Sequence, residues 1–160
     1  MNSLKMFLLL IIELLLLSCT GQDRTTKEVA DFYFQKNITF DKDLKICVIL
    51  PEVGCGGCIA SGVSFFQRNE SRFLKSQNER MIIFTAIHSK KMLYRTLEME
   101  NLDKYNCHLD EKSEFLVLGN NSIYPLILRL ENGIIVKAEY QSPYSENIFG
   151  KLELEINNEE

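Results

Sequence analysis

The sequence predicts an α/β domain with a mixed central sheet, in which a βαβ unit is followed by a β-hairpin. The first observation is that strand-like apolar runs at residues 45–50 and 80–87 alternate with amphipathic helical patterns, as in parallel βαβ units. The second is that two later strand-like runs are joined by Asn132-Gly133. This dipeptide is a strong hairpin signal, because a type I′ turn needs positive φ at both central residues. We therefore expect a mixed sheet flanked by helices.

The βαβ part begins with KICVIL at residues 45–50, an apolar and β-branched run that ends at Pro51. This pattern predicts a strand that is buried on both faces. Residues 59–77 then place apolar side chains on one face of an amphipathic helix, with Cys58 in or near its first turn.

The next strand and helix follow directly. Residues 80–87 (RMIIFTAI) predict a second buried strand. Ser89 is a suitable N-cap for a helix over roughly residues 90–105, because its hydroxyl can accept a hydrogen bond from a free backbone N–H. Leucines at 93, 97 and 102 lie on one side of that helix.

The C-terminal half contains the hairpin and a closing segment. Residues 115–118 are either a brief strand or a buried loop. Strands are expected over 126–130 and 134–140, with Pro125 just before the first, where it removes no central ladder hydrogen bond. Residues 145–156 favour a closing helix, although part of the segment alternates like a strand.

The first 19 residues resemble the signal peptide of a bacterial lipoprotein. Lys5 precedes an apolar run at residues 6–17, which is too short for a transmembrane helix of about 20 residues. The run ends in Leu-Leu-Ser-Cys, which resembles a lipobox whose cysteine, here Cys19, is lipidated and becomes the mature N-terminus. The resemblance implies a signal peptide over residues 1–18 and a lipid-anchored protein facing the periplasm or the cell exterior. An ordinary signal peptide and an uncleaved anchor are the alternatives.

Composition sets the number of domains and the class of partner. Residues 22–28 are polar, so we expect a tether over 19–39, although the aromatic residues of 29–40 should pack on the body. Residues 40–157 are long enough for one domain with a core. The net charge of −4, with no long basic stretch, argues against nucleic acid as a partner.

The stretch LPEVGCGGCIASG, residues 50–62, holds two cysteines at the junction of a predicted strand and a predicted helix. A helix N-terminus lowers the pKa of a cysteine thiol, because it presents unpaired N–H groups and the positive end of the helix dipole. The thiolate is the nucleophile in disulfide exchange. Cys55 would be the more exposed sulfur that attacks, and Cys58, about one turn on, would resolve the mixed disulfide.

The order of elements, this CxxC pair, and the tripeptide IYP ahead of the hairpin resemble the thioredoxin-like superfamily over roughly residues 40–157. The resemblance implies a thioredoxin-like fold and thiol–disulfide oxidoreductase activity. It implies Cys55 and Cys58 as catalytic residues. It also implies that Pro125 is cis, faces the pair and, with Tyr124, borders the protein substrate.

Three departures from the family pattern concern how the pair is tuned. Gly54 stands where many members have Trp, and Gly56 and Gly57 stand where many have a larger residue. The first strand also lacks the buried acid that assists proton transfer in thioredoxin, and Glu52 is the nearest acid. These differences bear on the redox poise and on the rigidity of the loop, because glycine is conformationally free.

Two other interpretations of the CxxC pair remain open. It is half of a zinc site if Cys107 and His108 complete the ligand set, although adjacent ligands on one ion give poor geometry. It is a structural disulfide if the chain is a non-catalytic binding lipoprotein. We expect Cys47 to be a buried apolar residue and Cys107 either to pair with Cys47 or to stay free, and we assign no role to His88 or His108.

We therefore expect an extracytoplasmic domain that exchanges disulfides with protein thiols and disulfides. We expect neither a metal nor a cofactor in this chemistry. A membrane redox partner would reset the CxxC pair, and Cys19 would hold the domain on the lipid bilayer.

Overall fold

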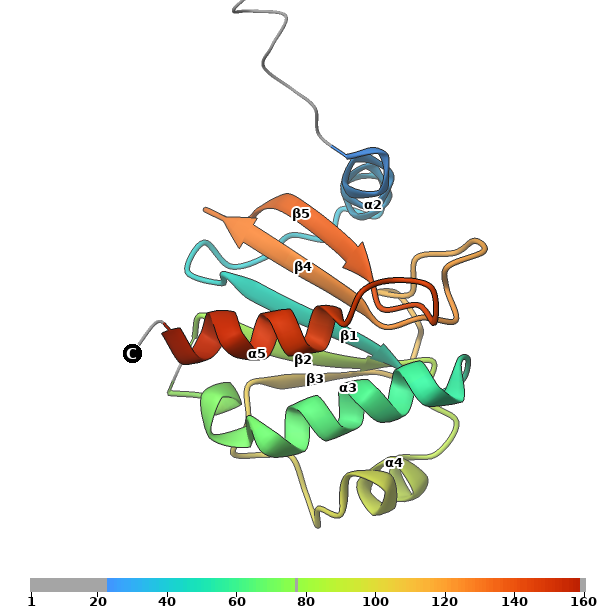
Figure 1. Cartoon of the computed structure of the whole chain (residues 1–160), viewed down its shortest axis with the longest axis vertical. Helices are drawn as coiled ribbons and strands as arrows, with labels where there is room; N and C mark the ends of the chain where they lie inside the picture. The colour runs from blue at the N-terminus through green and yellow to red at the C-terminus, as the bar shows by residue number, and fades with distance from the viewer. Residues whose placement is uncertain (1–22, 77, 159–160) are drawn as a thin grey trace, which may run out of the picture.

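The computed structural model of the chain describes residues 23–76 and 78–158 (Figure 1). A five-stranded sheet forms its centre, with helices on both faces. The elements in chain order are α2 (Arg24–Gln35), β1 (Ile46–Pro51), α3 (Gly56–Arg68), the 3₁₀ helix η1 (Glu70–Phe73), β2 (Arg80–Thr85), α4 (Lys90–Leu97), β3 (Cys107–Asp110), β4 (Leu126–Glu131), β5 (Ile134–Tyr140) and α5 (Ile148–Asn158).

The strand order of the sheet is β3-β2-β1-β4-β5. Strand β1 lies in the middle, parallel to β2 and antiparallel to β4. Strand β3 continues the parallel side, and β5 pairs with β4 as the second arm of a hairpin. A βαβ unit followed by a hairpin confirms the predicted mixed sheet and the thioredoxin-like fold class.

Strand β1 is buried on both faces, as its apolar sequence predicts. Alternate residues point to opposite faces of a sheet. Ile46, Val48 and Leu50 contact the core under α3, α4 and α5, whereas Cys47 and Ile49 contact the core under α2. Because packing and pairing hold β1 on every side, the chain that leaves its C-terminal end starts from a fixed position.

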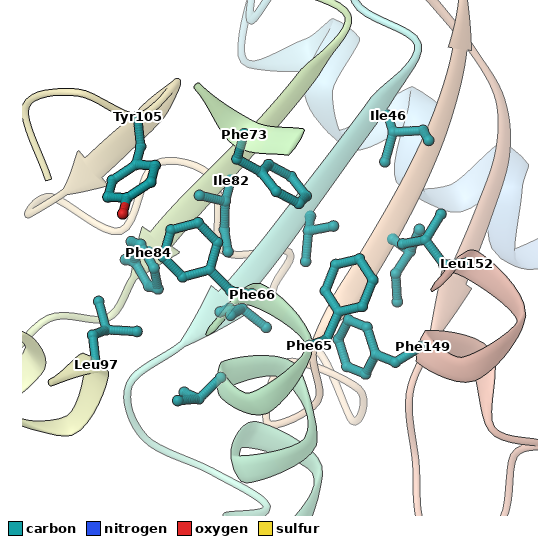
Figure 2. Close-up of a cluster of buried hydrophobic side chains, with 14 of the residues drawn as sticks. Ile46, Phe65, Phe66, Phe73, Ile82, Phe84, Leu97, Tyr105, Phe149 and Leu152 are labelled. Carbon is teal, nitrogen blue, oxygen red and sulfur yellow. The ribbon is translucent and has the colours of Figure 1, made fainter. Parts of the chain in front are cut away.

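The first core is rich in aromatic side chains, as Figure 2 shows. Phe65 of α3 stacks on Phe149 of α5 with ring centroids 5.1 Å apart. Phe66 of α3 meets Phe84 of β2 edge-on at 5.9 Å. These contacts fix α3 against the sheet and therefore fix the direction in which its N-terminus points.

Helix α2 begins inside the segment for which a tether is expected. Asp23 caps the helix by accepting from the Thr25 N–H, at 3.3 Å. The buried hydroxyl of Thr26 accepts from the Ala138 N–H of β5 at 3.0 Å, and Tyr33 donates to the Phe115 carbonyl at 2.8 Å. Thr26 and Tyr33 thus bind the sheet and its neighbouring loop. Of the aromatic residues expected to pack on the body, Phe32, Tyr33 and Phe40 do so, whereas Phe34 is 83% exposed.

The hairpin and the closing helix are confirmed. Asn132 and Gly133 have φ values of 53° and 79°, as a type I′ turn requires. Residues 115–118 form a loop rather than a strand. Helix α5 buries four residues on its inner face, Ile148, Phe149, Leu152 and Ile156.

Two helices are shorter than predicted, and one strand was not predicted. Helix α3 ends at Arg68, where the Asn69 side-chain amide donates to the Phe65 carbonyl and the chain continues as η1. Helix α4 has the predicted Ser89 cap but ends at Leu97, because Glu98 adopts the left-handed conformation with φ 56°. The following chain turns back and forms β3 along β2.

Candidate functional site

The CxxC pair lies where β1 ends and α3 begins. Cys55 is the N-cap residue of α3, and Cys58 lies in its first turn. A disulfide joins the two residues, whose Cα atoms are 5.3 Å apart. The strand supplies a fixed start and the helix a fixed end, so the two sulfurs are held together at one end of the sheet.

The two cysteines differ in exposure. Cys58 is buried, with 6% of its surface accessible, whereas Cys55 is partly exposed. Only an exposed sulfur can meet a disulfide of another protein, and a buried one can reach only its neighbour. The arrangement therefore suits the predicted roles of Cys55 as attacking residue and Cys58 as resolving residue.

The surroundings of the pair favour negative charge on Cys55. The first N–H groups of a helix have no carbonyl partner within the helix, and the dipole is positive at this end. Gly56 and Gly57 form the start of α3 and bring no charge or side-chain bulk to it. A thiolate at the N-cap can thus accept hydrogen bonds from the helix end.

A loop from the far half of the sequence closes against Cys55. The backbone N–H of Cys55 donates to the carbonyl of Ile123, at 2.9 Å. Gly54 lies directly on the backbone of Ile123, at a φ of 152°. Sequence reasoning missed both Gly54 and Ile123 as contact residues, although a glycine in place of the common Trp was a visible signal.

The Tyr-Pro dipeptide follows this contact. Tyr124 is half-buried, and its N–H donates to the Asn121 carbonyl at 3.0 Å. Pro125 is buried and accepts from the Gln141 N–H at 2.9 Å. The peptide bond before Pro125 is trans, as are the other bonds of the described residues, so the cis bond implied by the resemblance is absent there. The role of Tyr124 and Pro125 in binding the substrate stays a prediction.

The nearest acid has a structural position. The Glu52 carboxylate accepts from the His88 N–H and, at 3.4 Å, from the Ser89 N–H. It also lies 4.0 Å from the His88 ring nitrogen Nδ1. Glu52 therefore organises the turn that leads into α4.

The other two described cysteines are free thiols and do not pair. Cys47 is fully buried and faces the core under α2, and burial raises the pKa of its thiol. Cys107 packs on the opposite face of the sheet and donates to the Leu102 carbonyl at 3.4 Å. Burial is also the main cause that raises the pKa of the Cys107 thiol. The predicted option of a Cys47–Cys107 disulfide is therefore wrong, because the sheet separates the sulfurs.

The zinc alternative finds no ligand set in the described part of the chain. Within residues 23–76 and 78–158, no three His, Cys, Asp or Glu side chains gather where they could hold a metal ion. Cys107 and His108 lie on β3, two strands from β1, and do not complete the CxxC pair.

The predicted signal peptide and Cys19 lie outside the described residues. Among the helices that the structure does describe, none has the length and apolar character needed to cross a membrane. The lipid anchor stays a prediction from the sequence.

The chain was compared with protein families, curated proteins and solved structures. No family model matches the sequence, and no curated protein matches it. A solved structure of the thioredoxin domain of a thiol-disulfide oxidoreductase from Bacteroides vulgatus is similar, with 15% identity and a TM-score of 0.42. The match covers 71% of this chain and 80% of that one.

Proposed function

We propose that this protein is a thiol–disulfide oxidoreductase that exchanges disulfides with protein substrates outside the cytoplasm. One observation carries the proposal: a disulfide at the N-terminus of a helix, with Cys55 partly exposed and Cys58 buried. A structural staple needs neither this asymmetry nor a helix end that favours the thiolate of the exposed sulfur.

The reaction follows from the two positions. In the reduced protein, the Cys55 thiolate attacks one sulfur of a substrate disulfide, and a mixed disulfide forms while the other substrate sulfur leaves as a thiolate. The Cys58 thiolate then attacks the Cys55 sulfur and releases the second substrate thiolate. Two electrons pass from the Cys55–Cys58 dithiol to the substrate, and two protons follow. Each step is reversible, so the same pair can oxidise a substrate dithiol.

The location belongs to the same proposal. The apolar run ending in Leu-Leu-Ser-Cys supports lipidation of Cys19, which becomes the mature N-terminus when residues 1–18 are removed. More than one acyl chain is needed for stable membrane attachment. On the outer side of the cytoplasmic membrane a reductant needs a membrane partner that delivers electrons. The wild type should incorporate labelled fatty acid, and a Cys19→Ser variant should not. Incorporation by the variant equal to that of the wild type would overturn the anchor at Cys19.

The activity is tested with the full-length protein in detergent, using a protein disulfide such as that of insulin and a thiol reductant. We expect the protein to accelerate reduction, and a Cys58→Ser variant to accumulate mixed disulfides through Cys55 with proteins in cells. The matched control is Cys107→Ser, which changes a thiol on another strand. No acceleration together with no trapped partner would contradict the proposal and favour the structural disulfide.

A further inference from the structure

We infer that Gly54 is a positioning residue for Cys55: it allows the Ile123 carbonyl to bind the Cys55 N–H, and this bond holds the Cys55 sulfur over the N-terminus of α3. The inference deepens the proposed function and rests on it. It concerns how the reactivity of Cys55 is set in a chain that has glycine where many thioredoxin-like proteins have Trp.

The contact between Gly54 and Ile123 leaves no room for a side chain. A Cβ at Gly54 would lie 2.8 Å from the Ile123 Cα, 2.9 Å from its carbonyl carbon, and closer still to its carbonyl oxygen. Real Cβ atoms do not approach backbone this closely. The φ of 152° is also one that residues with a side chain rarely adopt. Any larger residue must therefore push the loop of Ile123 away from Cys55.

The same carbonyl is the acceptor for Cys55. The Ile123 carbonyl oxygen accepts a hydrogen bond from the Cys55 N–H at 2.9 Å. Cys55 directly follows Gly54, the residue that packs on this carbonyl. The bond joins backbone atoms, so breaking the disulfide removes none of its partners. It anchors the N-cap residue to a loop that precedes β4, on the other side of β1 from β2.

The helix holds Cys55 by its carbonyl, which accepts from the Ile59 N–H at 2.9 Å, so the Ile123 carbonyl is the anchor of its N–H. Gly56 and Gly57 are exposed, and a Cβ built on either would meet open space. Neither glycine therefore adds a side-chain contact to the first turn of α3, and glycine lowers the stability of a helix relative to alanine. A thiolate gains from the helix end only while its sulfur stays near the free N–H groups, because the dipole effect fades within one turn. The hydrogen bond from the Cys55 N–H to the Ile123 carbonyl therefore preserves the geometry that makes Cys55 reactive.

The test is a Gly54→Ala variant of the full-length protein, reduced and then alkylated with iodoacetamide across pH 5–10. Modification of Cys55 is located by fragment masses. In the wild type we expect a thiol pKa below the ordinary value of about 8.5. In Gly54→Ala we expect that pKa to rise by about one unit, which slows alkylation at pH 7 about tenfold. An unchanged pH profile in the variant would overturn the inference.

Gly133→Ala is the matched control. Gly133 also has a positive φ, of 79°, and a Cβ there would lie 2.8 Å from the Phe40 carbonyl oxygen. The substitution should therefore destabilise the fold in a similar way, but at the hairpin, away from the CxxC end of the sheet. We expect a lower melting temperature and an unaltered Cys55 pH profile. An equal shift of the Cys55 pKa in both variants would show a general structural effect and contradict a positioning role.

A second measurement needs no variant. Amide hydrogen exchange of the oxidised wild-type protein should show a protected Cys55 N–H beside faster exchange at Gly56 and Gly57, whose N–H groups lack helical partners. Fast exchange at Cys55 would overturn the inference. An ordinary wild-type Cys55 pKa would count against the proposed function itself, whereas a lowered pKa that Gly54→Ala leaves unchanged would defeat only the role of Gly54.

Discussion

The four described cysteines form two contrasting pairs. One pair lies at the end of the sheet, and the other lies within its strands. Cys55 and Cys58 lie where β1 meets α3 and are joined in a disulfide, with Cys55 partly exposed and Cys58 buried. Cys47 and Cys107 lie within strands on opposite faces of the sheet, and burial raises the pKa of both thiols. The contrast shows that position, more than residue type, separates a candidate catalytic thiol from a packing residue.

The largest expected effect concerns the nucleophile. Cys55→Ser removes the attacking sulfur and should lower disulfide exchange by at least about a thousandfold, because the remaining thiol of the pair, Cys58, is buried. Cys47→Ala should keep the rate within about twofold, since Cys47 lies in the core. Rates of reduction of a protein disulfide measure both. Substantial disulfide exchange by Cys55→Ser, or loss of exchange in a folded Cys47→Ala protein, would contradict the distinction between the CxxC pair and the core thiols.

The second prediction concerns how fast Cys47 is alkylated when the core around it is destabilised. Leu128 is fully buried in the same core, so Leu128→Ala should cost about 2–5 kcal/mol of unfolding free energy. Alkylation of Cys47 that follows transient opening should then rise roughly 30-fold to several thousandfold. Alkylation of reduced Cys55 should stay the same. Leu154→Ala, at a residue that is 66% exposed, is the control and should leave Cys47 labelling unchanged. Equal labelling of Cys47 in all three proteins would contradict its burial.

The third prediction uses pH. A buried thiol with a raised pKa keeps its proton in the folded state, whereas the unfolded chain loses that proton above about pH 8.5. The folded state then binds more protons, so the free energy of unfolding falls as pH rises above this value. Between pH 8 and 10 we expect Cys47 to account for about 1–2 kcal/mol of that fall.

Denaturant unfolding at pH 8 and pH 10 measures the effect, and Cys47→Ala should flatten the decline. Burial raises the pKa of Tyr140 to about 12, and the unfolded tyrosine titrates near pH 10, so the comparison stops there. An identical fall in unfolding free energy in the wild type and in Cys47→Ala would mean that the Cys47 thiol ionises as readily in the folded protein as in the unfolded chain.

The smallest predicted effect compares serine at the two free thiols. Cys107→Ser should change the unfolding free energy by less than about 1 kcal/mol, because a hydroxyl can donate to the Leu102 carbonyl as the thiol does. Cys47→Ser should cost about 1–3 kcal/mol, because it buries a hydroxyl in an apolar core. Denaturant titration at pH 7 measures both. A larger cost at Cys107 than at Cys47 would reverse the expected order.

The parts of the fold that were predicted are those whose signal is local. The apolar run of β1, the helical period after Cys58 and the Asn132-Gly133 turn each act within a few residues. Two elements depend on distant partners instead. Helix α2 is held by a hydroxyl at Thr26 that binds the edge strand β5, and a polar sequence does not reveal this bond. Strand β3 has a mixed sequence, CHLD, and becomes a strand only by pairing with β2.

In the candidate site, too, the local part was predicted and the contact with a distant segment was not. The two cysteines and their place before a helix follow from the CxxC motif and its neighbours. The contact of Gly54 and Cys55 with Ile123 joins segments almost 70 positions apart, and no periodic pattern encodes it. The tertiary structure was needed to see that a glycine before the motif admits a carbonyl to the helix N-cap.

The most direct test of the central claim is the reduction potential of the Cys55–Cys58 disulfide, measured in glutathione or thioredoxin redox buffers. A pair that exchanges with substrates should have a potential between about −120 and −270 mV, the range of known exchange proteins. A potential below about −300 mV, together with a Cys55 thiol of ordinary pKa, would describe an inert structural bridge and contradict the claim.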